Sequence, residues 1–133
     1  MIDPTFQIRK HYIDLLDISV PVVNMASLGT EPPFVYVSTR SQEQSTKNSE
    51  SHQTTTTINI IVKTDGDWGG DKMAEDIANE ITPLIKIVPY GETDDFKIVT
   101  CRVEASDPIT QINETGRVIQ KVLTIVNYVS RKS

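Results

Sequence analysis

The stretch RVIQKVLTIVNYV, from Arg117 to Val129, is the longest strand candidate in this chain of 133 residues. Successive side chains of a β-strand point to opposite faces of the sheet. The apolar residues form two sets, one on each face: Val118, Val122 and Val126; Ile119, Leu123 and Ile125. A strand that is apolar on both faces has to be covered on both faces. Since the chain offers only two helices, we expect a neighbouring subunit to supply part of the second cover.

Two helices are predicted upstream of this strand. The first starts with Asp3 as its cap and Pro4 at its first position, and its apolar residues recur at helical spacing up to about Ile18. The second is capped by Gly70 or Asp71 and should end or kink at Pro83, because the proline ring clashes with the preceding turn. Its predicted apolar face consists of Met73, Ala74, Ile77, Ala78 and Ile81.

Three further strands are predicted at Phe34–Arg40, Thr54–Thr64 and Phe96–Ala105, with residues 18–25 as an edge strand or extended lead-in and residues 106–116 as a turn region. In the third, alternation places Val99, Cys101 and Val103 on one side. The predicted fold class is α+β: a mostly antiparallel sheet of about four strands packed against two α-helices, with residues 1–133 forming one domain.

Residues 38–57, STRSQEQSTKNSESHQTTTT, contain no apolar side chain, no glycine and no proline. This composition cannot build a core, so the segment is either disordered or a polar β-hairpin arm that protrudes from the sheet. Its threonines favour extended structure and it joins two predicted strands, so we predict the arm. In either case His52 is expected to be a solvated residue.

The stretch GDWGGDK, residues 66–72, has three interpretations. A phosphate-binding loop needs its lysine directly after the last glycine, and here an aspartate intervenes. A calcium loop places Asp65, Asp67, Gly70 and Asp76 at suitable positions, but a glycine stands at the fifth. A tight turn that enters a helix explains every residue. Trp68 is then either a lid on the core edge or an interface anchor.

No catalytic set is visible in the sequence. The two histidines, His11 and His52, have no cysteine, serine or aspartate at a catalytic spacing, and the only cysteine, Cys101, reads as a small buried hydrophobe. We therefore predict no catalytic residue, no cofactor and no metal. A net charge of −5 argues against general nucleic-acid binding, and no apolar run reaches the length of a membrane span. Arg9 and Lys10 interrupt any signal peptide, so we expect a cytoplasmic chain.

The order of these segments, with PPFVYVSTR, TTTTINIIVKT and GGDKMAEDIANEI in succession, resembles the tail-completion proteins of tailed bacteriophages, also called tail terminator, neck or head–tail joining proteins. The resemblance implies a structural virion protein and no enzyme. It implies rings, commonly hexamers, that assemble in the host cytoplasm, end the tail tube and join it to the head connector. DNA would pass through the lumen without sequence-specific binding. The long polar arm and the negative net charge depart from the family pattern.

Two other functions compete with this one: a cytoplasmic α+β module that binds a peptide by strand addition, and a metal-dependent enzyme using Asp65, Asp67 and Asp71. For the virion protein, a like-charged lumen would let DNA slide. The residues predicted to make contacts with partners lie in the arm and in the turn: Gln42, Glu43, Lys47, Glu50, His52 and Trp68.

Overall fold

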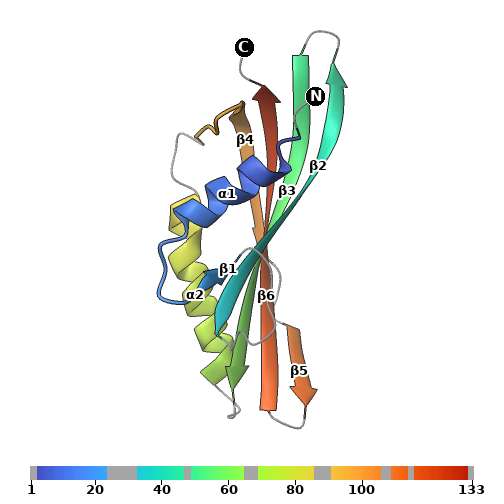
Figure 1. The fold of residues 1–133 in the computed structure, drawn as a ribbon. Coiled ribbons are helices and arrows are strands. Elements are labelled where there is room, and N and C mark those ends of the chain that lie inside the picture. Colours follow the sequence, from blue (N-terminus) through green and yellow to red (C-terminus); the bar gives the residue numbers. More distant parts are fainter. Residues whose placement is uncertain are drawn as a thin grey trace.

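A computed structural model describes residues 3–23, 33–46, 49–64, 69–85, 91–105, 109–113 and 116–131. It contains one sheet and two helices on the same side of it (Figure 1). The helices are α1 (Thr5–Leu15) and α2 (Gly69–Ile85). The strands are β1 (Val22–Val23), β2 (Phe34–Thr46), β3 (Ser49–Thr64), β4 (Phe96–Ala105), β5 (Ile109–Asn113) and β6 (Gly116–Arg131).

The sheet has the order β1-β2-β3-β6-β4, with β5 alongside β6. Apart from the short parallel pair of β1 and β2, every ladder is antiparallel. The long strands β2, β3, β6 and β4 therefore alternate in direction across the sheet. This confirms the predicted α+β class, and β1 confirms the extended lead-in that ends in an edge strand.

The core lies between the helices and one face of the sheet. Ile119, Leu123 and Ile125 of β6 are at most 3% exposed there, beneath apolar side chains of both helices. On the opposite face Val118, Val122 and Val126 are only half-buried, and no described helix covers that face. The two faces of β6 predicted from the sequence are thus confirmed. The expected cover by a second subunit stays a prediction.

Helix α1 is anchored at its start by Asp3. The Asp3 carboxylate accepts hydrogen bonds from the backbone N–H of Thr5 (2.8 Å), the hydroxyl of Thr5 (2.5 Å) and the hydroxyl of Ser41 in β2 (2.9 Å). The hydrogen bonds from Thr5 are the main cause that lowers the pKa of Asp3 below its ordinary value. Asp3 thus binds the first N–H of the helix, as a cap does, but the helix begins at Thr5 and Pro4 stands at the N-cap position, one residue later than predicted.

We expect Asp3→Ala to reduce the free energy of unfolding by about 1 kcal/mol, the usual loss when a helix-capping side chain is removed. A carboxyl group with a lowered folded pKa stabilises the fold above its unfolded pKa, and this contribution disappears as the pH falls through the folded pKa. The difference between wild type and variant should therefore shrink below about pH 4. Urea denaturation at pH 7 and pH 3 checks this, and an equal difference at both values would contradict it.

Helix α2 differs from the prediction in two ways, in the burial of Met73 near its start and in the residue at which it ends. Ala74, Ile77 and Ile81 are buried as expected, but Met73 is 37% exposed. The helix also continues through Pro83 to Ile85, which is buried against the core. Burial of Ile85 stabilises the last turn beyond the proline, which explains why Pro83 does not end the helix.

Strand β4 contains an irregularity that alternation alone does not predict. The ladder to β6 shifts between Ile98 and Thr100, so Val99 is an extra residue and is 53% exposed. Phe96 and Ile98 then share the helix-covered face with Cys101 and Val103, which pack partly buried against the core. The prediction that Val99 shares a side with Cys101 was wrong, because a β-bulge reverses the phase of a strand.

The turn predicted for residues 106–116 was also wrong in part, because Ile109–Asn113 forms β5 and pairs with the first half of β6. Its few apolar residues give a weak pattern, and pairing with a long neighbouring strand supplies what the sequence does not indicate. Asp65, Asp67 and Trp68, on which the calcium and turn interpretations depended, lie outside the described residues.

Candidate assembly surfaces

The segment 38–57 forms a β-hairpin, as predicted. Its ladder runs from Ser38 opposite Thr57 to Thr46 opposite Ser49. Only the distal part protrudes, because β3 pairs with β6 from Ser51 onward. The protruding arm is therefore residues 45–50, of which the structure describes 45–46 and 49–50. It is shorter than the twenty residues that the sequence suggested, and the other described residues of the segment belong to the central sheet.

His52 is buried at the base of this arm and is 3% exposed, so the expectation of a solvated residue was wrong. Its ring meets the ring of Phe96 edge-on, with centroids 5.8 Å apart. Thr54 and Thr56 on the same face of β3 are fully buried as well. Their neighbours on β6 and the helix layer cover them, whatever their own polarity. A strand's place in the sheet decides burial here, and composition does not.

The other predicted contact residues lie as follows. Gln42 is exposed on β2, opposite Gln53 of β3. Glu43 pairs with His52, and Glu50 pairs with Ser45, in the backbone ladder of the hairpin. Lys47 and Trp68 lie outside the described residues. The hairpin thus brings Gln42, Glu43 and Glu50 to one end of the sheet and separates His52 from the solvent.

A buried polar network beneath α1 was missed from the sequence. The hydroxyl of Tyr12 donates to Oδ1 of Asn127 (2.7 Å), and Nδ2 of Asn127 donates to the carbonyl of Thr100 (2.9 Å). Burial raises the pKa of Tyr12 above its ordinary value, and the nearby thiol of Cys101 raises it further. The network ties α1, β6 and β4 together. The single amide inside the apolar run IVNYV was the available signal.

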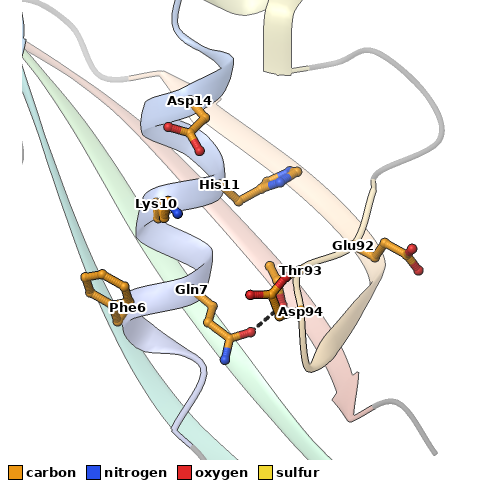
Figure 2. A pocket seen from close by; sticks show the side chains of 8 residues that line it. All are labelled: Phe6, Gln7, Lys10, His11, Asp14, Glu92, Thr93 and Asp94. Atoms are coloured by element: carbon orange, nitrogen blue, oxygen red, sulfur yellow. Dashed lines mark hydrogen bonds between the residues drawn. The ribbon is translucent and has the colours of Figure 1, made fainter.

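A groove lies between α1 and the turn that precedes β4 (Figure 2). Its volume is about 200 Å³, and its walls carry side chains of both charges: Phe6, Gln7, Lys10, His11, Asp14, Glu92, Thr93 and Asp94. Gln7 closes one wall, since its Oε1 accepts from the Thr93 hydroxyl (2.7 Å) and its Nε2 donates to Asp95 (2.7 Å). Within the described parts of the chain, no group of His, Cys, Asp and Glu is arranged to hold a metal ion.

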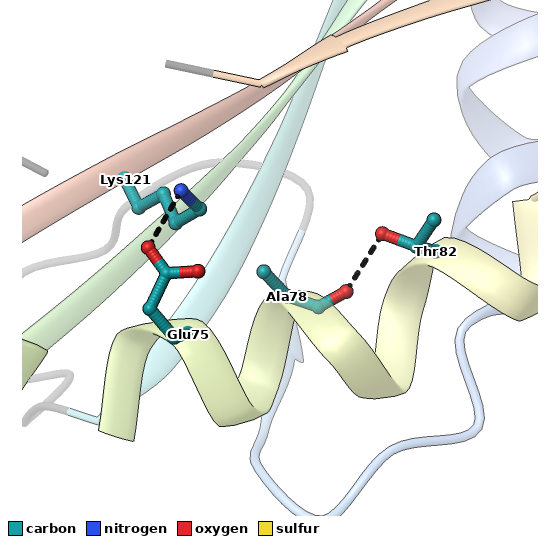
Figure 3. A network of polar contacts seen from close by, with 4 residues as sticks. All are labelled: Glu75, Ala78, Thr82 and Lys121. Atoms are coloured by element: carbon teal, nitrogen blue, oxygen red, sulfur yellow. Dashed lines mark hydrogen bonds and ion pairs between the residues drawn. The ribbon is translucent and has the colours of Figure 1, made fainter. Parts of the chain in front are cut away.

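Lys121 holds α2 against β6. Its side chain is 8% exposed, and its ammonium lies 2.9 Å from the carboxylate of Glu75, as Figure 3 shows. Further along α2, the Thr82 hydroxyl donates to the carbonyl of Ala78 (2.9 Å). A lysine on the helix-covered face of a central strand needs such a partner, because an unpaired buried charge is strongly unfavourable. Lys121 is therefore a packing residue that positions α2.

Charge is distributed unevenly between the two sides of the sheet. On the face without helices, the ladder places four basic residues, Arg40, Lys63, Lys97 and Arg102, and one described carboxylate, Glu104. Arg102 and Glu104 form an exposed ion pair at 3.4 Å. The described acidic side chains gather instead on the helices and the turn before β4: Asp3, Asp14, Asp17, Glu75, Asp76, Glu80, Glu92, Asp94 and Asp95. Among the described side chains, the acidic residues are therefore concentrated on the helix side.

Comparison with solved structures shows a related fold. The chain is similar to one in a structure entitled "Virion of native gene transfer agent (GTA) particle", with a TM-score of 0.66 and 11% sequence identity. The similarity covers 95% of this chain and 95% of that one. No protein-family model and no curated protein sequence matches the chain. Neither described helix is long and apolar enough to span a membrane. At this identity the comparison establishes a shared fold over nearly the whole chain.

Proposed function

We propose that this protein is a structural component of a phage-like virion, without enzymatic activity. The observation that carries the proposal is the match of fold, end to end, with a chain from a gene transfer agent particle. A match over 95% of both chains means that the two proteins are alike in size as well as in topology. The described residues add no catalytic arrangement that would favour an enzyme, and the groove beside α1 is lined by side chains of both charges.

Within the virion, we propose a ring at the neck or the upper end of the tail, which ends the tail tube and joins it to the head connector. The sequence resemblance supports this position. So does the arm of residues 45–50, because a polar hairpin that leaves the sheet at one end is suited to contact with an adjacent ring. A lumen that repels DNA would require the acidic helix side to face inward.

The first experiment is electron microscopy and mass measurement of the purified protein, alone and mixed with tail tubes of the same phage. Rings of about six copies, or binding to tube ends, are expected. A protein that stays monomeric at high micromolar concentration and ignores tubes would contradict the proposal. A monomer that captures extended peptides would favour the strand-addition module instead.

Shortening the arm should impair assembly without unfolding the protein. Replacing residues 45–50 by Asn-Gly closes the hairpin directly after Gln44 with a turn that two-residue loops favour. We expect the free energy of unfolding to change by less than about 1 kcal/mol, because the removed residues pair only with each other. Binding to tubes or connectors should be lost. Normal assembly of this variant would show that the arm has no such role.

The matched control is the deletion of residues 41–53, which also removes the buried His52 and its pairing with Val129 of β6. This larger deletion should destabilise the fold itself. A comparison of the two variants by circular dichroism and urea denaturation therefore separates an effect on assembly from an effect on folding.

A further inference from the structure

The sheet has two long outer edges along which no other described strand pairs. On one side, β1 pairs with β2 at Val35 and Tyr36, and no described strand pairs with the outer edge of β2 from Val37 to Thr46. On the other side, β4 pairs with β6 alone, and the turn before β4 covers its outer edge only as far as the hydrogen bond from Ile98 to the carbonyl of Gly91. From Val99 to Ala105, no described strand pairs with the outer edge of β4, and these two stretches are called the open edges below. Neither stretch contains a proline.

The two open edges lie at the same height of the sheet. The ladders connect Ala105 through Leu123 and Ile58 to Val37, and they connect Thr100 through Tyr128 and Gln53 to Gln42. Open backbone N–H and C=O groups on an edge strand are a template for pairing with another chain. Because the two open edges occupy the same range along the strand direction, the β4 edge of one copy can pair with the β2 edge of another copy without a large shift along the strands.

The strand directions also fit. The long strands alternate, so β4 runs opposite to β2. Rotation about an axis close to the strand direction leaves these directions unchanged, and a second copy placed beside the first therefore continues the antiparallel order. We propose that copies of this chain associate head to tail, with the β4 edge of one copy pairing with the β2 edge of the next. This inference rests on the ring proposed above and names its interface.

The charges select the register of this interface. At equal height, Arg102 of one copy meets Arg40 of the next, and like charges directly opposite each other are destabilising. A shift of one residue would mismatch the two faces of the sheet. A shift of two residues places Glu104 opposite Arg40 and Arg102 opposite Gln42. The proposed register is therefore the one that joins Glu104 to Arg40 of the next copy.

The same arrangement determines which side faces inward. A heterologous interface of this kind closes into a ring when the rotation between copies is suitable. Both helices lie on one side of the sheet, and the larger circumference outside the strands accommodates them. The face without helices then lines the lumen, with Arg40, Lys63, Lys97 and Arg102 among its charges. Repulsion of DNA by an acidic lumen, expected from the net charge, does not follow for this ring.

Disulfide cross-linking tests the interface. In a Cys101→Ala background, Gln42→Cys combined with Arg102→Cys places the two thiols opposite each other across the proposed interface. Directly opposed residues of antiparallel strands lie within the range that a disulfide bridges. Within one chain these positions are three strands apart, about 14 Å, which is too far. Mild oxidation should give a ladder of covalent oligomers that dithiothreitol removes.

The matched control is Ser38→Cys with Arg102→Cys, whose thiols have the same chemistry but stand four residues away from the proposed register. It should give about tenfold less cross-linked product, since its sites exceed disulfide distance. Rings seen by microscopy without a ladder from the Gln42 pair would overturn this interface and leave the proposed function intact. A ladder from the Ser38 pair alone would overturn the register. Absence of rings and of tube binding in the wild type would overturn both proposals.

Discussion

Replacing Leu123 by alanine is expected to reduce the free energy of unfolding by about 2 to 5 kcal/mol, the range for deleting a large apolar side chain from a packed core. Leu123 is 2% exposed and belongs to the core cluster between the sheet and the helices. The cavity left behind is lined by side chains of the sheet and of α2, which cannot collapse fully into it. Urea denaturation of dilute protein, followed by circular dichroism, gives the difference directly.

The matched variant is Val122→Ala, one residue earlier on the same strand. Val122 points to the face without helices and is only half-buried, so its truncation should reduce the free energy of unfolding by less than about 1 kcal/mol. Since the two residues are neighbours on β6 but lie on opposite faces of the sheet, a difference in the free energy of unfolding between the two variants reports on the face and not on the position along the strand. Equal losses at both positions in dilute protein would contradict the one-sided cover that the structure describes.

Replacing Asn127 by alanine is the second large effect, with an expected loss of about 2 to 4 kcal/mol. Asn127 is fully buried, and its removal leaves the Tyr12 hydroxyl and the Thr100 carbonyl without their partner. A buried polar group without a partner carries its full desolvation penalty. Asn79→Ala, on the exposed side of α2, is the control and should change stability little. Comparable losses in the two variants would contradict the role of the network.

A double-mutant cycle with Tyr12→Phe measures the hydrogen bond itself. Its pH dependence has a defined sign. Tyr12 has a raised pKa in the fold, whereas in the unfolded chain it ionises near 10.0. Its contribution to stability is therefore present below that value and is lost as the pH rises above it, because the unfolded chain releases the proton first. Tyr12→Phe should flatten the fall in stability between pH 9 and pH 11. An unchanged slope would place Tyr12 outside the network.

The candidate surfaces were only partly predictable. The arm was visible as a long polar segment between two strands. Glu50 lies in the arm, and Gln42 and Glu43 lie at its base in the sheet. The open edges could not be predicted, because strands far apart in the sequence pair with each other and no local pattern indicates which strands lie at the edges of the sheet. The burial of His52 was equally hidden, since it depends on β6 extending to Arg131 beside it.

The sequence by itself determined the order of the two helices and of the long strands β2, β3, β4 and β6, the two-sided character of β6 and, except at Met73, the buried face of α2. Each of these depends on a repeat of side chains within one segment. The tertiary structure decided which side of the sheet the helices cover, where the bulge in β4 reverses the alternation, and that β5 is a strand. These features arise from contacts between segments far apart in the chain, whose energies no local pattern contains. Both open edges of the sheet are of this second kind.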